Sequence, residues 1–342
     1  MQTEPIVLAR GLTGSQTYST FQYDLVLYAL VAVGMGLFAS MIYALVTRTE
    51  VSKKYRGAAH ASALISGVAT LGYLALIAFW IVGFKLRGES WVPNPAHYFS
   101  NGFRYTDWTI TVPLLTAELL AVCALAGDKA RSLRFTTMSA AFLMIVTGFI
   151  GNELNEGASP NTAALLIWGA ISTVFYLYLY VALAGAVRAS LPELSERTGK
   201  SLKNATILLF AVWGTYPVVY LIFAFTKHST YWAITAQLLF CAADLTAKAG
   251  FGALIHKIAK LRTAEDALRG EETLPDIYPE EVYVSHQKLS EPQHPLRTSD
   301  NPSHPEFAGS TLTSTAGGRS AAPGPIGVQD RLDSGDPGSR RV

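Results

Sequence analysis

FCAADLTAKAGFGALI, residues 240–255, is the centre of an apolar run, 231–259, that is long enough to cross a lipid bilayer as one helix. Within it, Asp244 and Lys248 stand four residues apart and therefore share one helix face. Ionisable side chains inside a membrane span are costly, so their presence indicates a function. Two interpretations stay open here. Either the ion pair holds helices together, or the lysine forms a Schiff base with an aldehyde, and the resulting cation then needs a nearby anion.

Six further apolar runs of membrane-spanning length precede this one. They are 20–47, 56–84, 103–127, 132–152, 161–190 and 201–226. Only 15% of the residues are charged, whereas soluble domains carry about a quarter. We therefore predict an all-α membrane protein with a seven-transmembrane-helix bundle. The connection 85–102 contains two prolines and two glycines and is not expected to be helical.

Basic residues in the connections predict the orientation. Lys and Arg gather within 48–56, 129–134 and 188–203, which join runs one to two, three to four and five to six. The fourth and fifth runs are joined without Lys or Arg, and the sixth and seventh with Lys227 alone. Cytoplasmic loops carry the excess of Lys and Arg. The N-terminus is therefore expected outside and the C-terminus in the cytoplasm.

The chain is expected to have three parts. They are an extracellular segment, 1–19, a seven-helix domain, 20–262, and a cytoplasmic tail, 263–342. Nine of the sixteen prolines fall after residue 270, among many Ser, Gly and charged residues. Such a composition cannot bury enough apolar surface to offset the entropy of ordering. We expect the tail to be largely disordered from about 270.

Composition excludes several classes of site. The net charge is +2, and no basic run with interleaved aromatic residues indicates nucleic-acid binding. The two cysteines, Cys123 and Cys241, lie in apolar runs and are interpreted as small buried hydrophobes. The chain lacks the spacing of a metal site or a disulfide framework.

The third run contains a line of polar residues in RYTDWTITVPLLTAELL, residues 104–120. Arg104, Asp107 and Thr111 recur at helical spacing on one face. Glu118 follows Asp107 by eleven residues, about three turns and roughly 16 Å along the same face. A structural role explains one such residue better than three, whereas a proton path explains all of them. For Glu118, a carboxylate near the inner membrane interface that reaches water is the alternative.

Three motifs resemble those of the microbial rhodopsins, the seven-helix retinal proteins. They are R-Y-x-D-W-x-x-T-x-P-L-L in 104–115, W-x-x-Y-P-V-V in 213–219 and D-x-x-x-K-x-G-F-G in 244–252. The resemblance covers about 20–260. The triplet Asp107, Thr111 and Glu118 matches the pattern of the proteorhodopsin-like and xanthorhodopsin-like outward proton pumps. The resemblance implies a light-driven ion transporter, not an enzyme, in the cell membrane of a prokaryote. It also implies contact with the lipid bilayer and assembly as a homo-oligomer.

The resemblance implies roles for the polar residues. Lys248 would carry all-trans-retinal as a Schiff base, with Asp107 as primary counterion and proton acceptor and Asp244 as second counterion. Thr111 would hydrogen-bond Asp107. A chloride pump would lack the carboxylate at 107, and a sodium pump would have Asn at that position.

Two more residues complete this proton path. Arg104 would stabilise the anions and gate release to the outside, and Glu118 would be the cytoplasmic proton donor. A sodium pump would have Gln at 118, and a sensory rhodopsin often lacks a carboxylate there.

The resemblance also implies a retinal pocket. Its aromatic residues would be Trp108, Trp213, Tyr216 and Tyr220, with further walls from Leu115, Met144, Gly148, Ser172 and Pro217. Leucine at 115 implies absorption of green light. Gly169 occupies a position at which xanthorhodopsin-like pumps stack a carotenoid antenna, so a carotenoid partner is implied there. A glycine that serves helix packing is the alternative.

The sequence departs from the family at two further places. Many such pumps pair the counterion with a histidine on the second helix, and alignment on Ser66 and Gly67 places Leu76 there. The connection between the sixth and seventh runs lacks the two glutamates that release the proton in bacteriorhodopsin. Release is expected through another group, with Glu89, Glu153 and Glu156 as candidates, or later in the cycle.

Two rival functions remain open. A photosensor would signal through the long cytoplasmic tail, and sustained light-driven acidification of the medium would count against it. A retinal-free transporter would lack a visible absorbance band that depends on Lys248.

Overall fold

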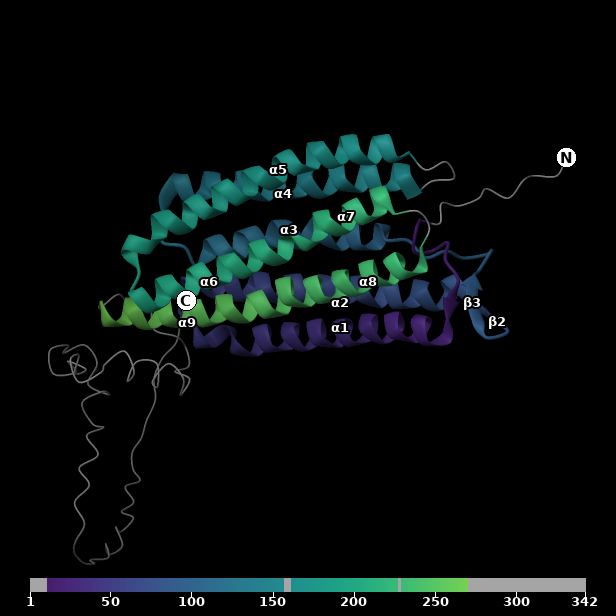
Figure 1. The fold of residues 1–342 in the computed structure, drawn as a ribbon. Coiled ribbons are helices and arrows are strands. Elements are labelled where there is room, and N and C mark those ends of the chain that lie inside the picture. The colour runs from purple at the N-terminus through teal and green to yellow at the C-terminus, as the bar shows by residue number, and fades with distance from the viewer. Residues whose placement is uncertain (1–10, 157–160, 227–228, 270–342) are drawn as a thin grey trace, which may run out of the picture. The chain divides into compact units, whose positions relative to one another are not determined.

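The computed structural model describes residues 11–156, 161–226 and 229–269, and Figure 1 shows their arrangement as a bundle of long helices. The helices are α1 (Thr20–Thr47), α2 (Arg56–Gly83), α3 (Gly102–Ala121), α4 (Gly127–Glu156), α5 (Thr162–Ser190), α6 (Glu196–Trp213), α7 (Thr215–Phe225), α8 (Thr230–Leu245) and α9 (Phe251–Leu268). Short 3₁₀ turns follow α1 at Arg48–Glu50 and α5 at Leu191–Glu193. The predicted disorder from about 270 lies outside the described residues.

Neighbouring helices in the chain are neighbours in space, from α1 against α2 through to α4 against α5. The last segments close the bundle, because α8 packs on α1 and α7, and α9 packs on α6 and α2. Six segments are long and apolar enough to qualify as spans by length and hydropathy alone. The remaining helix, α3, carries three charged residues, Arg104, Asp107 and Glu118, all of them buried. It crosses the bundle between α2 and α4, so the described helices form seven crossings.

Two crossings are interrupted. The sixth breaks at Gly214, between α6 and α7, three residues before Pro217. Proline lacks the amide hydrogen that would bond the carbonyl four residues earlier, which places the break at Trp213. The seventh contains a π turn, Thr246–Gly250, between α8 and α9. By contrast, α3 continues through Pro113 without a break.

Helix ends differ from the expected runs at the cytoplasmic side. The third run was expected to reach 127, but α3 ends at Ala121, and Gly127, with a φ of 68°, already begins α4. In the loop between α3 and α4, the main-chain amide of Ala124 donates to the hydroxyl of Ser190 at 2.9 Å. The last helix continues to Leu268, past the predicted boundary at 262.

Polar contacts explain why α9 extends so far. Asp266 is buried and accepts hydrogen bonds from Lys54 Nζ at 2.9 Å and from the Tyr55 hydroxyl at 2.5 Å. Arg262 donates to the main-chain carbonyl of Val122 at 2.9 Å. Burial, followed by the hydrogen bond to Asp266, raises the pKa of Tyr55 to about 12. The loops after α1 and α3 therefore supply partners for an additional two turns of helix.

A small sheet occupies the opposite end. Strands β2 (Phe84–Arg87) and β3 (Ser90–Pro93) form an antiparallel hairpin, and β1 (Tyr18–Ser19) pairs with β3. The turn contains Gly88 with a φ of 62°, a conformation that glycine adopts without strain. Residues 85–101 are thus non-helical, as the prolines and glycines predicted, and Gly102 already begins α3.

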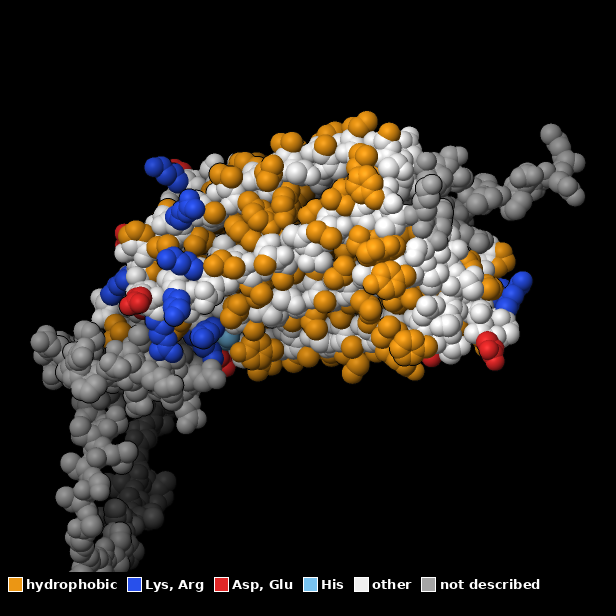
Figure 2. Space-filling model, in the orientation of Figure 1, with side chains coloured by type: hydrophobic (Ala, Val, Ile, Leu, Met, Phe, Trp, Pro, Cys, Tyr) orange, Lys and Arg blue, Asp and Glu red, His pale blue; other side chains and the backbone are white. Residues whose placement is uncertain are grey.

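The outer surface is suited to a membrane. Figure 2 shows hydrophobic side chains spread along the helices, with Lys and Arg gathered at the end where α9 ends and α6 begins. Large apolar residues are well exposed along the helices, among them Phe21, Met35, Leu71, Val174 and Val181. The basic end is the one expected to face the cytoplasm.

Candidate functional site

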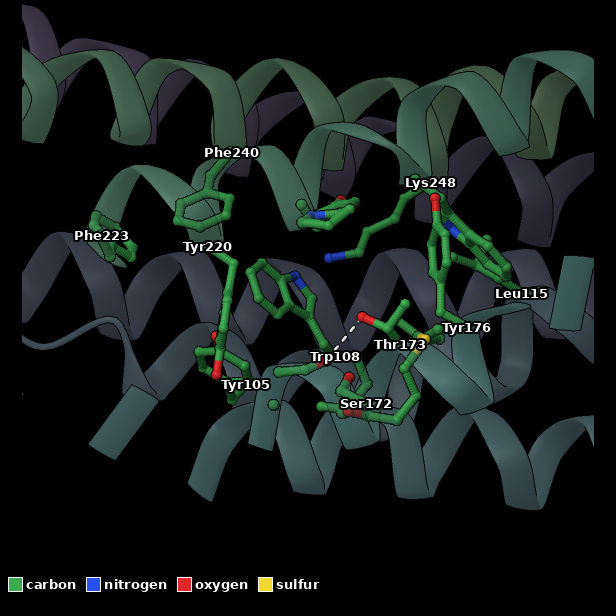
Figure 3. A pocket seen from close by; sticks show the side chains of 18 residues that line it. Tyr105, Trp108, Leu115, Ser172, Thr173, Tyr176, Tyr220, Phe223, Phe240 and Lys248 are labelled. Carbon is green, nitrogen blue, oxygen red and sulfur yellow. Dashed lines mark hydrogen bonds between the residues drawn. The ribbon is translucent and has the colours of Figure 1, made fainter. Parts of the chain in front are cut away.

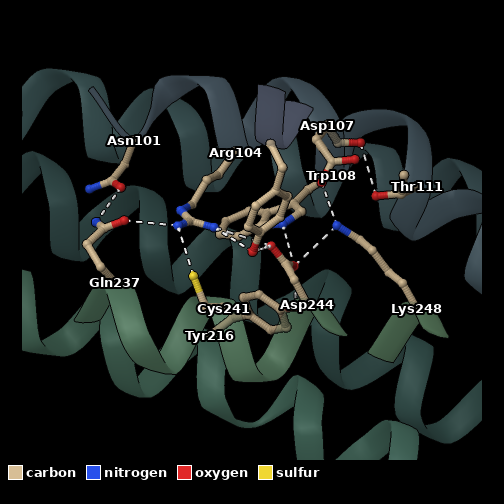
Figure 4. Close-up of polar contacts among 11 residues, drawn as sticks. Asn101, Arg104, Asp107, Trp108, Thr111, Tyr216, Gln237, Cys241, Asp244 and Lys248 are labelled. Carbon is tan, nitrogen blue, oxygen red and sulfur yellow. Dashed lines mark hydrogen bonds and ion pairs between the residues drawn. The ribbon is translucent and has the colours of Figure 1, made fainter. Parts of the chain in front are cut away.

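The π turn presents Lys248 to the interior of the bundle, where the side chain is only 2% exposed. Its Nζ lies 2.5 Å from Asp107 Oδ2 on α3 and 3.2 Å from Asp244 Oδ1 on α8 (Figure 4). One buried cationic nitrogen thus lies between two buried carboxylates. The fold thus brings Asp107 of α3 together with Asp244 and Lys248 of the last crossing, the three residues that the sequence singled out.

Asp244 also accepts hydrogen bonds from four other side chains. Its Oδ1 accepts from Trp108 Nε1 at 3.0 Å and from the Tyr216 hydroxyl at 2.8 Å. Its Oδ2 accepts from the Tyr73 hydroxyl at 2.9 Å and from Arg104 Nη1 at 3.4 Å. Hydrogen bonds to a buried carboxylate stabilise its ionised form. Asp244 is therefore well stabilised as an anion.

Asp107 is bonded much more sparsely. Its Oδ2 accepts from Lys248, and its Oδ1 has no hydrogen-bond partner among the described residues. The Thr111 hydroxyl contacts Asp107, as expected, but it donates to the main-chain carbonyl at 3.0 Å. The carboxylate at 107 therefore depends on the lysine nitrogen for its stabilisation.

The second helix faces Asp107 with Gly72, not with Leu76. A Cβ atom built on Gly72 would lie 3.2 Å from the Cβ atom of Asp107. Leu76 lies one turn further along α2, in the apolar cluster that contains Trp80. The alignment on Ser66 and Gly67 was thus wrong by one turn. Within the described part of the chain, no imidazole contacts the Asp107 carboxylate.

Glu118 lies in the cytoplasmic half of the bundle and is fully buried. The Ser62 hydroxyl of α2 donates to its Oε1. Gly252 of α9 leaves room beside it, because a Cβ atom there would lie 3.6 Å from Oε1. This burial does not agree with a carboxylate at the interface that reaches water.

Arg104 links the anions to a second polar group on its outer side. Its Nη2 donates to Gln237 Oε1 at 2.9 Å, and both side chains are buried. Among the release candidates, Glu89 is exposed next to the hairpin turn, and Glu153 lies beside Gly102. The side chain of Glu156 lies outside the described part of the structure.

A pocket surrounds the Lys248 side chain (Figure 3). All of the predicted wall residues line it: Trp108, Leu115, Met144, Gly148, Ser172, Trp213, Tyr216, Pro217 and Tyr220. Gly169, expected to mark a carotenoid position, lines it too. Further walls come from residues such as Phe240 and Tyr176 that the sequence did not single out. Its lining is mostly aromatic and aliphatic, and Lys248 is its one amine. Such a pocket fits an elongated apolar aldehyde.

Gly169 lies against the aromatic ring of Tyr220. A Cβ atom at 169 would lie 2.7 Å from Tyr220 Cε1, closer than van der Waals contact permits. The Tyr220 hydroxyl donates to the main-chain carbonyl of Leu165 at 2.9 Å. The ring of α7 thus rests against α5 at a position where a larger residue would displace it.

Comparison with known proteins agrees with this geometry. Residues 24–261 match the family model described as bacteriorhodopsin-like protein. This chain is a microbial rhodopsin. It is 31% identical over 238 residues to bacteriorhodopsin-I of Haloarcula marismortui, which covers 64% of this chain and 84% of the relative. It is 28% identical to the blue-light absorbing proteorhodopsin of Gamma-proteobacterium Hot 75m4, over 66% of this chain and 83% of the relative.

A solved structure extends the likeness to three dimensions. The crystal structure of xanthorhodopsin, described as a light-driven ion pump with dual chromophore, has a TM-score of 0.69 and 30% identity to this rhodopsin. The match covers 74% of this chain and 98% of that one. The predicted family, seven-helix fold and prokaryotic multi-pass membrane location are confirmed. Family membership also supports retinal as the cofactor and light-driven ion transport as the activity.

Sequence patterns missed several polar neighbours of the site. Tyr73 and Ser62 are ordinary residues in an apolar run, and nothing in their spacing relates them to α3 or α9. Gln237 did offer a signal, since it is an amide inside a span, seven residues or two turns before Asp244. The helix face that contains Asp244 therefore predicts Gln237 as a further polar residue toward the extracellular end.

Proposed function

We propose that this rhodopsin is a light-driven outward proton pump. The observation that carries the proposal is the placement of two buried carboxylates on α3, Asp107 beside the Lys248 nitrogen and Glu118 about three turns toward the cytoplasm. Arg104 stands on the outer side of the same helix face. The two carboxylates would hold the transported proton in turn, and Arg104 stands at the outer end of their line.

Lys248 would hold retinal within the apolar pocket. Bound there, retinal would supply absorption of visible light and a light-induced movement at the lysine nitrogen. The rings of Trp108 and Trp213, both lining the pocket, would confine it and exclude water.

Asp107 is the proposed acceptor of the proton from Lys248 Nζ. The two atoms concerned, Nζ and Oδ2, are 2.5 Å apart, which is within the reach required for direct transfer. Asp244 lies near the same nitrogen, but four other donors stabilise its charge. When the lysine nitrogen moves, Asp107 loses the donor of its 2.5 Å hydrogen bond and gains most by taking up a proton.

Glu118 is the proposed donor from the cytoplasmic side. Full burial disfavours its charged form, and Ser62 is its hydrogen-bonding partner on α2. The carboxyl is therefore expected to hold a proton until the lysine nitrogen needs one. It would then be refilled from the cytosol.

Glu118→Gln is expected to slow return of the proton to the Lys248 nitrogen by roughly 10²-fold, because an amide of the same shape cannot donate it. Loss of the proton from that nitrogen should stay nearly unchanged, since Asp107 is intact. Time-resolved absorption after a laser flash measures both steps.

Two further measurements make this assignment falsifiable. Added azide, a small diffusible acid, should restore the rate in Glu118→Gln. Ser62→Ala keeps the carboxyl and should have a much smaller effect. An unaltered proton return in Glu118→Gln would contradict the donor role.

The proposed function is tested with cells that express the full chain and receive all-trans-retinal. In unbuffered salt, illumination should lower the external pH, and a protonophore should abolish the change. Pumping of another ion would instead drive passive proton movement that a protonophore enhances. A lack of any light-driven pH change would contradict pumping and favour the photosensor.

An antenna carotenoid is the second part of the proposal. The pocket beside Gly169 reaches Thr173 and Pro217, which are exposed on the outer surface of α5 and α7. The xanthorhodopsin structure, with its dual chromophore, is 30% identical to this chain. A carotenoid lying against Gly169 would therefore come close to the retinal pocket.

Energy transfer tests the carotenoid site. Carotenoid added to the purified pigment should give a carotenoid band in the fluorescence excitation spectrum, and Gly169→Trp should remove it. Gly185→Trp is the matched control on α5, because a Cβ atom at Gly185 meets no atom within 4 Å. A band that survives Gly169→Trp would place the carotenoid elsewhere.

A further inference from the structure

We infer that Gln237 is a positioning residue, which holds the Arg104 guanidinium inward against Asp244 and seals the outer half of the proton path with groups that cannot release a proton. The inference rests on the proposed outward transport of protons. We use the term lock for three hydrogen-bonded side chains at the extracellular end: the amides of Asn101 and Gln237 and the hydroxyl of Thr13. They come from three segments far apart in the chain.

The guanidinium is held from two sides. On the inner side, Arg104 Nη1 lies 3.1 Å from the Tyr73 hydroxyl and 3.4 Å from Asp244 Oδ2. On the outer side, Nη2 donates to Gln237 Oε1 at 2.9 Å. Figure 4 shows Gln237 and Asp244 on opposite sides of the guanidinium. Without the outer acceptor, one end of a buried cation would lose its partner, which is costly.

The orientation of the Gln237 amide is itself fixed. Its Nε2 donates to Asn101 Oδ1 at 2.8 Å and to Thr13 Oγ1 at 3.2 Å. The Asn101 amide nitrogen also lies 3.5 Å from Thr13 Oγ1. With two acceptors on this side, the oxygen of Gln237 must point to the arginine. A reversed amide would set its nitrogen against the guanidinium.

The chain before the first helix completes the lock. Thr13 is 1% exposed, and its main-chain carbonyl accepts a hydrogen bond from the Tyr18 hydroxyl at 2.7 Å. Asn101 and Gln237 are 2% and 0% exposed. These three residues therefore lie in the interior, between Arg104 and the extracellular surface, and are tied to the strand β1.

The chemistry of these groups sets the order of proton release and uptake. Amides and hydroxyls carry no proton that they release near neutral pH, and a guanidinium does not deprotonate in proteins. Within the described residues, Arg104 contacts no carboxylate on its outer side. Glu153, beside Gly102, has no hydrogen-bond partner for its Oε1 among the described residues and so is not joined to this lock. A proton taken up by Asp107 thus has no second acid in contact with Arg104 to displace. We expect it to stay there until the cytoplasmic side has been reloaded, so that uptake precedes release.

The positioning role predicts an effect on the colour titration. Protonation of Asp107 by added acid removes the negative charge beside Lys248 and shifts absorption to longer wavelength. If the outer acceptor is lost, the guanidinium must turn to bring Nη2 to another acceptor, and its 3.4 Å contact with Asp244 is loosened. The charge of Asp244 is then less compensated, and its repulsion of the Asp107 anion grows. Asp107 then takes up its proton at higher pH. Lys248, Asp244 and Arg104 are the charged groups around it.

The experiment uses the full-length retinal-loaded protein in lipid vesicles. Gln237→Met, which keeps the length but removes the amide, should raise the midpoint of the acid colour change by about one pH unit. Thr230→Val is the control, since this hydroxyl on the same helix contacts Thr17 and Gln16 outside the lock. If Gln237→Met forms no pigment, Asn101→Ala should shift the midpoint in the same direction.

A flash experiment with a pH-sensitive dye tests the order of events in the unmodified protein. Uptake should come first and release second. Release before uptake, or an unmoved midpoint in Gln237→Met and Asn101→Ala, would overturn the inference. The colour titration needs no transport, so its outcome is independent of the cell acidification experiment. Failure of pumping with a shifted midpoint would reject the proposed function while keeping the positioning role.

Discussion

Lys248→Ala is expected to leave the protein colourless after addition of all-trans-retinal. The pocket would keep its aromatic walls, but Lys248 supplies its one amine. Without that nitrogen no covalent bond to the aldehyde can form. The measurement is the visible absorbance of membranes titrated with retinal, and borohydride treatment should fix no pigment on the variant.

The loss of the positive charge at position 248 must be distinguished from the loss of the covalent bond to retinal. Lys248→Arg keeps a cation between Asp107 and Asp244 and should preserve the fold, yet it should also stay colourless. Lys257→Ala removes an exposed lysine from the same crossing and should form normal pigment. A visible band in both Lys248 variants would exclude this residue as the site of attachment.

Asp107→Asn is expected to abolish transport and move the absorption maximum to longer wavelength. An amide cannot accept the proton from the Lys248 nitrogen 2.5 Å away, so we expect that transfer to slow by roughly 10²-fold or more. The wavelength moves because a negative charge that stabilised the cation is lost. Static spectra and light-driven acidification measure the two effects on the same membranes.

The neighbouring Thr111 provides the control for Asp107. Thr111→Val removes a hydroxyl that donates to the main-chain carbonyl of Asp107 but leaves the carboxylate in place. It should keep transport and most of the spectrum. An unchanged spectrum in Asp107→Asn would refute the counterion assignment, whereas lost transport with an unchanged spectrum in Thr111→Val would reveal a separate role for that hydroxyl.

Periodicity made much of this site predictable. Hydropathy gives the crossings, because a span must be about 20 residues long. Helical spacing gives the shared faces of Arg104, Asp107 and Glu118 on α3 and of Asp244 and Lys248 on the last crossing. A cation and two anions buried on two helices must meet, since each alone would be costly in a low-dielectric interior. The structure places Lys248 between the two aspartates accordingly.

Contacts between helices were harder to foresee. Gly72 faces Asp107, but a single sequence does not fix how far α2 is shifted along α3, and the expected Leu76 was one turn away. The lock on Arg104 joins Thr13, Asn101 and Gln237, whose separations in the chain are 88 residues or more. Polar pairs so distant leave no periodic pattern. These contacts exist only in the three-dimensional arrangement of the extracellular end of the bundle.

The widened turn at Thr246–Gly250 also affects the register of the seventh crossing. A π turn contains one residue more than the α-helical pattern requires, and one residue corresponds to about 100° of rotation. The faces of α8 and α9 are therefore out of phase with each other. On α8, before the π turn, Asp244 and Gln237 face Arg104. On α9, after the π turn, the rotated face brings Gly252 next to Glu118. Deleting a single alanine, such as Ala247, would restore uniform winding and turn one half of the crossing away from its partners.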